Sequence, residues 1–141
     1  MNAEQIFSIV NPVAMIGWLL LLIVPRWKFT NMLVLSAAIP LLLSVAYLAL
    51  IIVFFGRSEG GFGSLPEVMK LFSYEWAALA GWIHYLAFDL FVGSWEVKDA
   101  QANSISHWFV IPCLILTFLL GPIGFLLYHI LRFFLSKKVQ K

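Results

Sequence analysis

The chain has too few charged residues to be a soluble domain. Asp, Glu, Lys and Arg make up 11% of its 141 residues, and hydrophobic residues make up 62%. An ordinary soluble domain has about 25% charged and roughly 45–50% apolar residues. Nine basic and seven acidic side chains cannot form a shell against water, so most of the surface must contact lipid. The composition therefore indicates a small integral membrane protein.

Cysteine and clusters of basic residues are equally scarce. Cys113 is the single cysteine, which excludes an intramolecular disulfide and any multi-cysteine zinc or iron–sulfur site. A net charge of +2 without a basic stripe argues against nucleic-acid binding. Residues 1–5 contain Glu4 and no basic residue, so we expect neither a cleavable signal nor a transit peptide.

Four long apolar stretches predict the fold. A helix needs about 20 residues to cross the hydrocarbon core of a bilayer, and each stretch is near or above that length. We expect a single all-α domain over residues 1–141, a polytopic antiparallel bundle of four transmembrane helices. Pro112 and Pro122 should kink the fourth helix, and the carbonyl groups that they free, at Trp108 and Phe118, then need partners. The predicted helices cover residues 6–24, 31–55, 74–95 and 107–134.

A shorter helix is expected before the third span. Ser64 and Glu67 have the spacing of a capping box, and Pro66 falls in the first turn, where a missing N–H costs little. The pattern predicts an interfacial helix over residues 65–72. The preceding run Gly60–Gly63 lacks the Gly-Lys-Ser/Thr of a phosphate-binding loop, so we interpret it as an ordinary loop.

The distribution of basic residues predicts an orientation. An even number of crossings places both termini on one side, and basic residues favour the cytoplasmic side. Both termini are therefore expected in the cytoplasm, and the location expected is the plasma (bacterial inner) membrane. The termini side would hold six basic residues: Arg57, Lys70, Arg132, Lys137, Lys138 and Lys141. The opposite side would hold three: Arg26, Lys28 and Lys98.

Ionisable side chains inside the third helix indicate a candidate site. A carboxyl or imidazole group within a bilayer is costly unless it is paired, which makes it a functional hypothesis by default. Tyr85 and Asp89 share one face of the helix, with Trp82 close to it, whereas His84 points roughly 140° away from Asp89. A structural hydrogen bond from Asp89 to another helix is the alternative interpretation, and for His84 both interpretations are open.

The fourth helix provides the facing surface. Cys113, Thr117, Gly121 and Gly124 lie on one stripe, and small residues let helices approach closely in lipid. Packing is the favoured interpretation of this stripe. We also expect Cys113 and Thr117 to border a polar cavity with His84 and Asp89.

No metal site and no cofactor are expected. The three histidines lie at different depths along the chain. Haem or a metal held by His84 and His107 is a minor alternative, because it would require the helices to shift considerably.

The third helix also carries a family resemblance. The run Gly81–Phe91, G-W-I-H-Y-L-A-F-D-L-F, resembles the signature of the abscisic-acid-deficient-four-like family. The runs Pro112–Leu114 and Gly121–Gly124 are similar to the family's last helix, and Ile9–Pro12 is a weaker match to its first. The resemblance covers essentially the whole four-helix layout. Plant members of this family are neoxanthin synthases of the plastid.

The resemblance implies an isomerisation. An epoxide of violaxanthin opens while a neighbouring polyene C–H is lost, which requires a general acid and a base. By resemblance His84 and Asp89 are the catalytic candidates, with Tyr85 beside them, and Trp82, Cys113 and Thr117 are candidates for substrate binding. The chain resembles a bacterial relative, since it has no transit extension, and its ligand is expected to be a carotenoid or another isoprenoid lipid. The alternative is a non-catalytic bundle that binds lipid or assists another membrane protein, and a homo-oligomer is left open.

Overall fold

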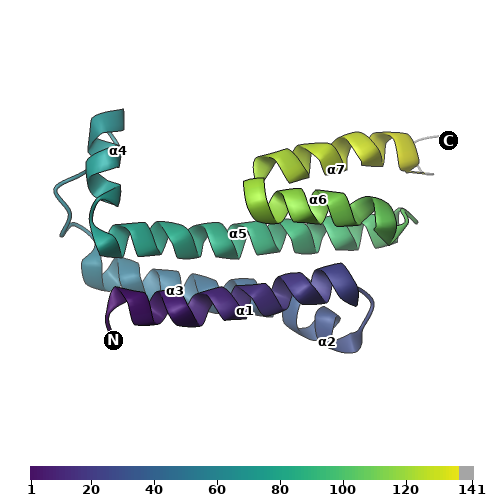
Figure 1. Cartoon of the computed structure of the whole chain (residues 1–141), viewed down its shortest axis with the longest axis horizontal. Helices are drawn as coiled ribbons and strands as arrows, with labels where there is room; N and C mark the ends of the chain where they lie inside the picture. The colour runs from purple at the N-terminus through teal and green to yellow at the C-terminus, as the bar shows by residue number, and fades with distance from the viewer. Residues whose placement is uncertain (137–141) are drawn as a thin grey trace.

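The computed structural model describes residues 1–136, and within them every regular element is a helix, without a strand (Figure 1). The elements are α1 (Ala3–Ile23), α2 (Lys28–Thr30), the π-helical turn η1 (Asn31–Leu35), α3 (Ala38–Phe54), α4 (Leu65–Phe72), α5 (Glu75–Ala102), α6 (His107–Leu120) and α7 (Pro122–Leu135).

Three segments are long and apolar enough to cross a membrane. They are α1, the segment Lys28–Phe54 and α5. α5 lies at the centre and packs against α1, α3, α6 and α7. Its glycines permit close contact, because a Cβ at Gly93 would lie 2.8 Å from the ring of Trp18. Leu90 and Ile83, on the same helix, are completely buried, so the core of the bundle forms around α5.

The second span contains a break that the sequence did not predict. The expected helix 31–55 starts with η1 and is interrupted at Ala37, which has a left-handed φ of 65°. Two carbonyl groups beside the break accept hydrogen bonds from side chains of α5. Ser94 Oγ donates to the Val34 carbonyl at 3.2 Å, and Lys98 Nζ donates to the Leu35 carbonyl at 3.2 Å. These bonds satisfy backbone groups that lipid could not.

The predicted fourth helix, 107–134, is wrong as a single kinked span. α6 ends at Leu120, Gly121 adopts φ 38° and ψ −89°, and Pro122 is the first residue of α7. Proline disfavours an α-helical residue before it and suits a first helical position, so the Gly-Pro pair ends one helix and starts another. α6 and α7 pack together as an antiparallel hairpin (Figure 1). Each has 14 residues, too few to cross a core that needs about 20.

The hairpin returns the chain to the end of the bundle that lies opposite the start of α1. Trp82, early in α5, donates to Asn11 of α1, whereas Ser136, which follows α7, donates to Asn103 at the far end of α5. The start of α1 and the end of α7 therefore lie at opposite ends of the bundle (Figure 1). The expectation of both termini on one side depended on four crossings, which the structure does not confirm. Lys137, Lys138 and Lys141, counted in that argument, lie outside the described residues.

This arrangement predicts the result of a topology experiment. With three crossings and a hairpin that returns to its own side, reporters fused before Met1 and after Lys141 should lie on opposite sides of the membrane. A reporter inserted at Gly61 should match the N-terminal one. Terminal reporters on the same side would show that α6 and α7 cross the membrane as one helix.

The short helix before α5 is confirmed with its expected bounds, Leu65–Phe72. Ser64 Oγ accepts the Glu67 amide at 3.4 Å, while the Glu67 carboxylate accepts the Gly63 amide at 3.1 Å. α4 runs across the axis of the bundle (Figure 1), as a helix in the plane of a membrane surface would. Phe72 anchors it over Gly81, where a Cβ would lie 2.6 Å from the Phe72 ring.

Candidate functional site

One face of α5 carries a row of polar side chains towards the hairpin. We call this row the polar stripe. Spacings of three, four and seven residues keep its members on one face of the helix. Its members are Tyr85, Asp89, Glu96, Asp99 and Asn103.

Tyr85 forms the first connection between the stripe and the hairpin. Its hydroxyl group donates to the carbonyl oxygen of Phe118 in α6. That carbonyl would ordinarily bond the amide of residue 122, which is a proline and has no N–H. The prediction that the freed Phe118 carbonyl needs a partner is confirmed, and the partner is Tyr85.

Asp89 lies at the tip of the hairpin. A Cβ at Gly121 would lie 3.0 Å from Asp89 Oδ1, so the glycine lets the turn close over the carboxyl group. Oδ2 is buried and has no hydrogen-bond partner. The residue stands near the midpoint of α5, where a carboxyl group without a partner is costly to bury.

Glu96 is the residue that sequence reasoning missed. The predicted helix ended at Trp95 and assigned Glu96 to a loop, whereas α5 continues to Ala102. Glu96 is 0% exposed. Thr117 Oγ1 donates to its Oε1 at 2.9 Å, while Oε2 has no partner. The sequence did contain one signal that could have identified Glu96, which is its position two helical turns beyond Asp89 on the same face.

The far end of the stripe holds the hairpin against α5. Asp99 Oδ2 accepts Arg132 Nε at 2.6 Å and the Tyr128 hydroxyl at 2.8 Å. Ser136 Oγ donates to Asn103 Oδ1 at 3.2 Å. These polar partners join α7 to α5, so we interpret this end as structural.

A cavity of about 270 Å³ adjoins the Tyr85 end of the stripe. We call it the lateral groove. Trp82 Nε1 donates to Asn11 Oδ1 at 2.9 Å along its wall. Trp82 is 41% exposed and Leu119 is 59% exposed, so the groove opens sideways, where lipid would lie. Three elements line it, through Asn11, Ala14, Met15, Trp82, Tyr85, Leu86, Phe118 and Leu119.

The structure separates some of the predicted site residues. Trp82, Tyr85 and Asp89 lie on the groove and hairpin side of α5. His84 instead lies exposed beside Tyr47 of α3, at 5.7 Å between ring centroids, and stacks on Phe88. Neither His84 nor Asp89 is among the residues that line the lateral groove. The lateral groove is therefore not the expected cavity shared by His84 and Asp89, and these two side chains face different helices.

Cys113 and Thr117 lie inside the hairpin region and do not line the groove. Both are completely buried. Cys113 Sγ is 3.5 Å from the Phe109 carbonyl, and the backbone of Cys113 is close to Gly124. Thr117 acts as the partner of Glu96. The small residues do permit close packing, but they do not form the predicted stripe on one helix, because Gly124 of α7 faces Cys113 and Thr117 of α6 across the hairpin.

Residues 1–136 contain no group of three His, Cys, Asp or Glu side chains that could hold a metal ion. His107 Nε2 lies 3.0 Å from the Leu22 carbonyl at the end of α1, far along the bundle from the Tyr47 contact of His84. The haem or metal alternative therefore gains no support from the positions of these imidazoles.

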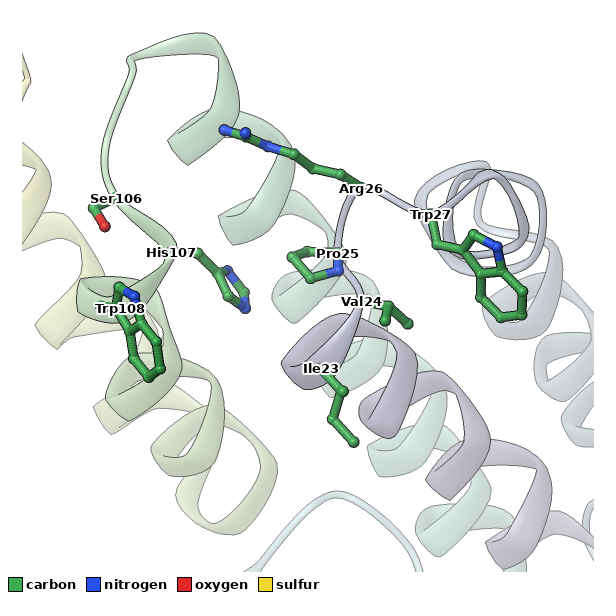
Figure 2. A pocket seen from close by; sticks show the side chains of 8 residues that line it. All are labelled: Ile23, Val24, Pro25, Arg26, Trp27, Ser106, His107 and Trp108. Carbon is green, nitrogen blue, oxygen red and sulfur yellow. The ribbon is translucent and has the colours of Figure 1, made fainter.

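A second cavity lies at the end of the bundle, between the end of α1 and the start of α6 (Figure 2). It is larger, at about 660 Å³. None of the residues of the polar stripe line it, so it is separate from the candidate site.

Comparison with known proteins identifies the family. No curated protein and no solved structure matches the chain. The family model described as ABA DEFICIENT 4-like matches residues 5–128. This range includes α1 from Gln5 onwards, the other two spanning segments, all of α6, and Tyr85, Asp89 and Glu96. The match agrees with the resemblance seen in the run Gly81–Phe91, and the chain belongs to the ABA DEFICIENT 4-like family.

Proposed function

We propose that this protein is a membrane isomerase that acts on a carotenoid or another isoprenoid lipid by acid–base chemistry. The observation that carries the proposal is the position of Tyr85 and Asp89. Tyr85 lines a groove that opens towards lipid, and the Asp89 carboxyl, which is not part of the groove lining, lies one helical turn away at the hairpin tip. Family membership supports the substrate class.

The lateral groove suits one end of a long apolar molecule. Its walls include Ala14, Met15, Leu86 and Leu119, while Trp82 and Tyr85 supply polar groups. This combination of apolar walls and few polar groups is typical of small-molecule sites. A volume of about 270 Å³ holds an end ring but not a whole carotenoid. The polyene would therefore extend past the exposed Leu119 into the bilayer.

Opening an epoxide beside a polyene needs one proton delivered and one removed. The C–O bond breaks as the oxygen gains a proton, and the electron pair of the lost C–H bond completes the allene. Atoms and electrons balance without a co-reactant, because the product is an isomer. We assign proton delivery to the Tyr85 hydroxyl and proton removal to Asp89. Return of the proton from Asp89 to Tyr85 then restores both groups for the next turnover. His84 lies outside this step because it faces α3.

The proposal is tested by reconstituting the purified protein with an epoxycarotenoid. Chromatography with mass detection should reveal an isomer of unchanged mass and changed retention time. Tyr85→Phe should lower the rate by about 10²- to 10⁴-fold, the usual contribution of a positioned acid or base. Tyr47→Phe, a matched change on the α3 side, should retain the wild-type rate. Equal rates for both variants would remove Tyr85 from the chemistry.

A non-catalytic lipid-binding protein is the second candidate. The Tyr85 hydroxyl already donates its proton to the Phe118 carbonyl, and this favours a structural role. In that case the carotenoid would remain bound to the purified protein in unchanged form. Trp82→Leu would then reduce the bound carotenoid, while no isomer would form with any variant.

We also propose an orientation in the plasma (bacterial inner) membrane. Among the described residues, Arg57 and Lys70 lie towards the start of α5. The far end of the bundle has four basic residues among those described, against these two. Because basic residues favour the cytoplasmic side, the far end should be cytoplasmic and the N-terminus external. The basic residues at that far end are Arg26, Lys28, Lys98 and Arg132.

A further inference from the structure

The cavity at the end of the bundle has one charged and one apolar part. In Figure 2 the Arg26 side chain extends above the cavity, and the His107 ring points towards Pro25. Ile23 and Trp108 lie lower, along α1 and α6. The cavity thus presents a cation at its outer end and apolar side chains along the two helices.

Several carbonyl groups beside this cavity already accept hydrogen bonds. Helix ends leave carbonyl groups without partners, but those of α1 are largely used. His107 Nε2 lies 3.0 Å from the Leu22 carbonyl, and Thr30 Oγ1 donates to the Val24 carbonyl at 2.7 Å. α6 begins at the cavity, and although the Phe109 amide donates to the Ser106 carbonyl at 3.0 Å, the two amide groups before it point outwards from the helix end. The cavity therefore favours a ligand that accepts hydrogen bonds.

The charge around the cavity is positive. Within residues 1–136, Arg26 makes no ion pair. Glu96 is completely buried, and Asp99 is already bonded to Arg132. No exposed carboxylate from the described part of this end thus competes for Arg26. The cation is available to an anionic ligand.

Aromatic side chains place the cavity at the membrane boundary. Trp108 is 81% exposed and Trp27 is 49% exposed, and tryptophan concentrates where the headgroups meet the hydrocarbon core. Ile23, 71% exposed, continues the apolar wall towards the bilayer. A ligand here would have its polar part at headgroup level and its apolar part in the hydrocarbon.

We infer that this cavity binds an anionic glycerophospholipid. Its phosphate lies against Arg26 and the start of α6, and an acyl chain follows Ile23 and Trp108. Basic pockets between transmembrane helices are a known means of holding acidic lipid headgroups. A zwitterionic lipid carries a cation that this positive end repels, so the site should discriminate between the two classes.

The inference is tested by titrating the purified full chain in neutral detergent with phosphatidylglycerol or phosphatidylcholine. Native mass spectrometry counts the lipids that remain bound. Phosphatidylglycerol should bind more tightly, and Arg26→Gln should weaken it by about fivefold, since one basic residue contributes about 1 kcal/mol to such binding. Arg57→Gln, the matched change at the other end, should have no effect. Size-exclusion chromatography checks that both variants are folded.

Two further experiments distinguish a bound lipid from a bound phosphate ion. Trp108→Ala removes part of the acyl wall without altering charge, and it should also weaken phosphatidylglycerol binding. Excess inorganic phosphate should leave the bound lipid in place, because an ion lacks the apolar contacts. The inference would be overturned if the two lipids bound equally well, or if Arg57→Gln weakened phosphatidylglycerol binding as much as Arg26→Gln. Displacement of the bound lipid by inorganic phosphate would also overturn it.

Discussion

Gly124→Ala is expected to open the α6–α7 hairpin and to sharply reduce the yield of folded protein. A Cβ at this position would lie 2.1 Å from the Thr117 amide nitrogen and 2.5 Å from the Cys113 carbonyl oxygen. Both are backbone atoms, which cannot rotate away. Overpacking a core with flexible side chains costs about 1–3 kcal/mol, and contact with backbone exceeds that range. The two helices must therefore separate.

The consequences should reach the polar stripe. Separation of α7 moves Tyr128 and Arg132 away from Asp99, which leaves a carboxylate without partners. Thermal unfolding in detergent, followed by size-exclusion chromatography, measures the loss. Leu126→Ala is the matched control on α7, because Leu126 is 60% exposed and faces lipid. Equal tolerance of the two changes would mean that α6 and α7 do not pack as a hairpin.

The helices that depend on local signals were predictable from the sequence. α1 is apolar throughout its second half, and α4 has a serine cap followed by Pro66 in its first turn. These signals act within a few residues, so their outcome depends little on tertiary structure. The same holds for the face that Tyr85 shares with Asp89, which follows from the helical period alone.

The hairpin was not predictable from hydropathy. Residues on both sides of Gly121–Pro122 are apolar, and a membrane helix with a proline kink has the same composition as two helices joined by a tight turn. The choice between them depends on packing. Gly124 permits the backbone of α7 to approach Thr117. Tyr85 of α5 donates a hydrogen bond to the Phe118 carbonyl group near the end of α6.

The position of Glu96 was missed for a related reason. Glu96, Lys98 and Asp99 resemble a polar loop when they are read in isolation. In the structure α5 continues through them, and the hairpin supplies a partner for one oxygen of each carboxyl group, Thr117 for Glu96 and Arg132 for Asp99. A buried polar residue is tolerated when its partner comes from a distant part of the chain.

Asp89→Asn is expected to abolish isomerisation while leaving the fold intact. Asparagine has nearly the shape of aspartate but cannot take up the proton lost from carbon. Loss of a positioned base lowers a rate by about 10²- to 10⁴-fold. Stability should not fall, because Asp89 Oδ2 has no hydrogen bond to lose. Replacing an unpaired carboxyl with a neutral amide removes a desolvation cost.

His84→Gln provides the matched control on the other face of the helix. His84 lies against Tyr47 and Phe88, away from the lateral groove, so this variant should retain its turnover. An inactive His84→Gln beside an active Asp89→Asn would reverse the assignment and place the reaction on the α3 side of α5.

The rate of isomer formation by wild type and Asp89→Asn, in identical vesicles loaded with one epoxycarotenoid, tests the central claim most directly. Matched melting curves in detergent establish that both proteins are folded. The account predicts an allenic isomer from wild type and only unchanged substrate from Asp89→Asn. Equal rates for the two folded proteins, or no isomer from either, would contradict it.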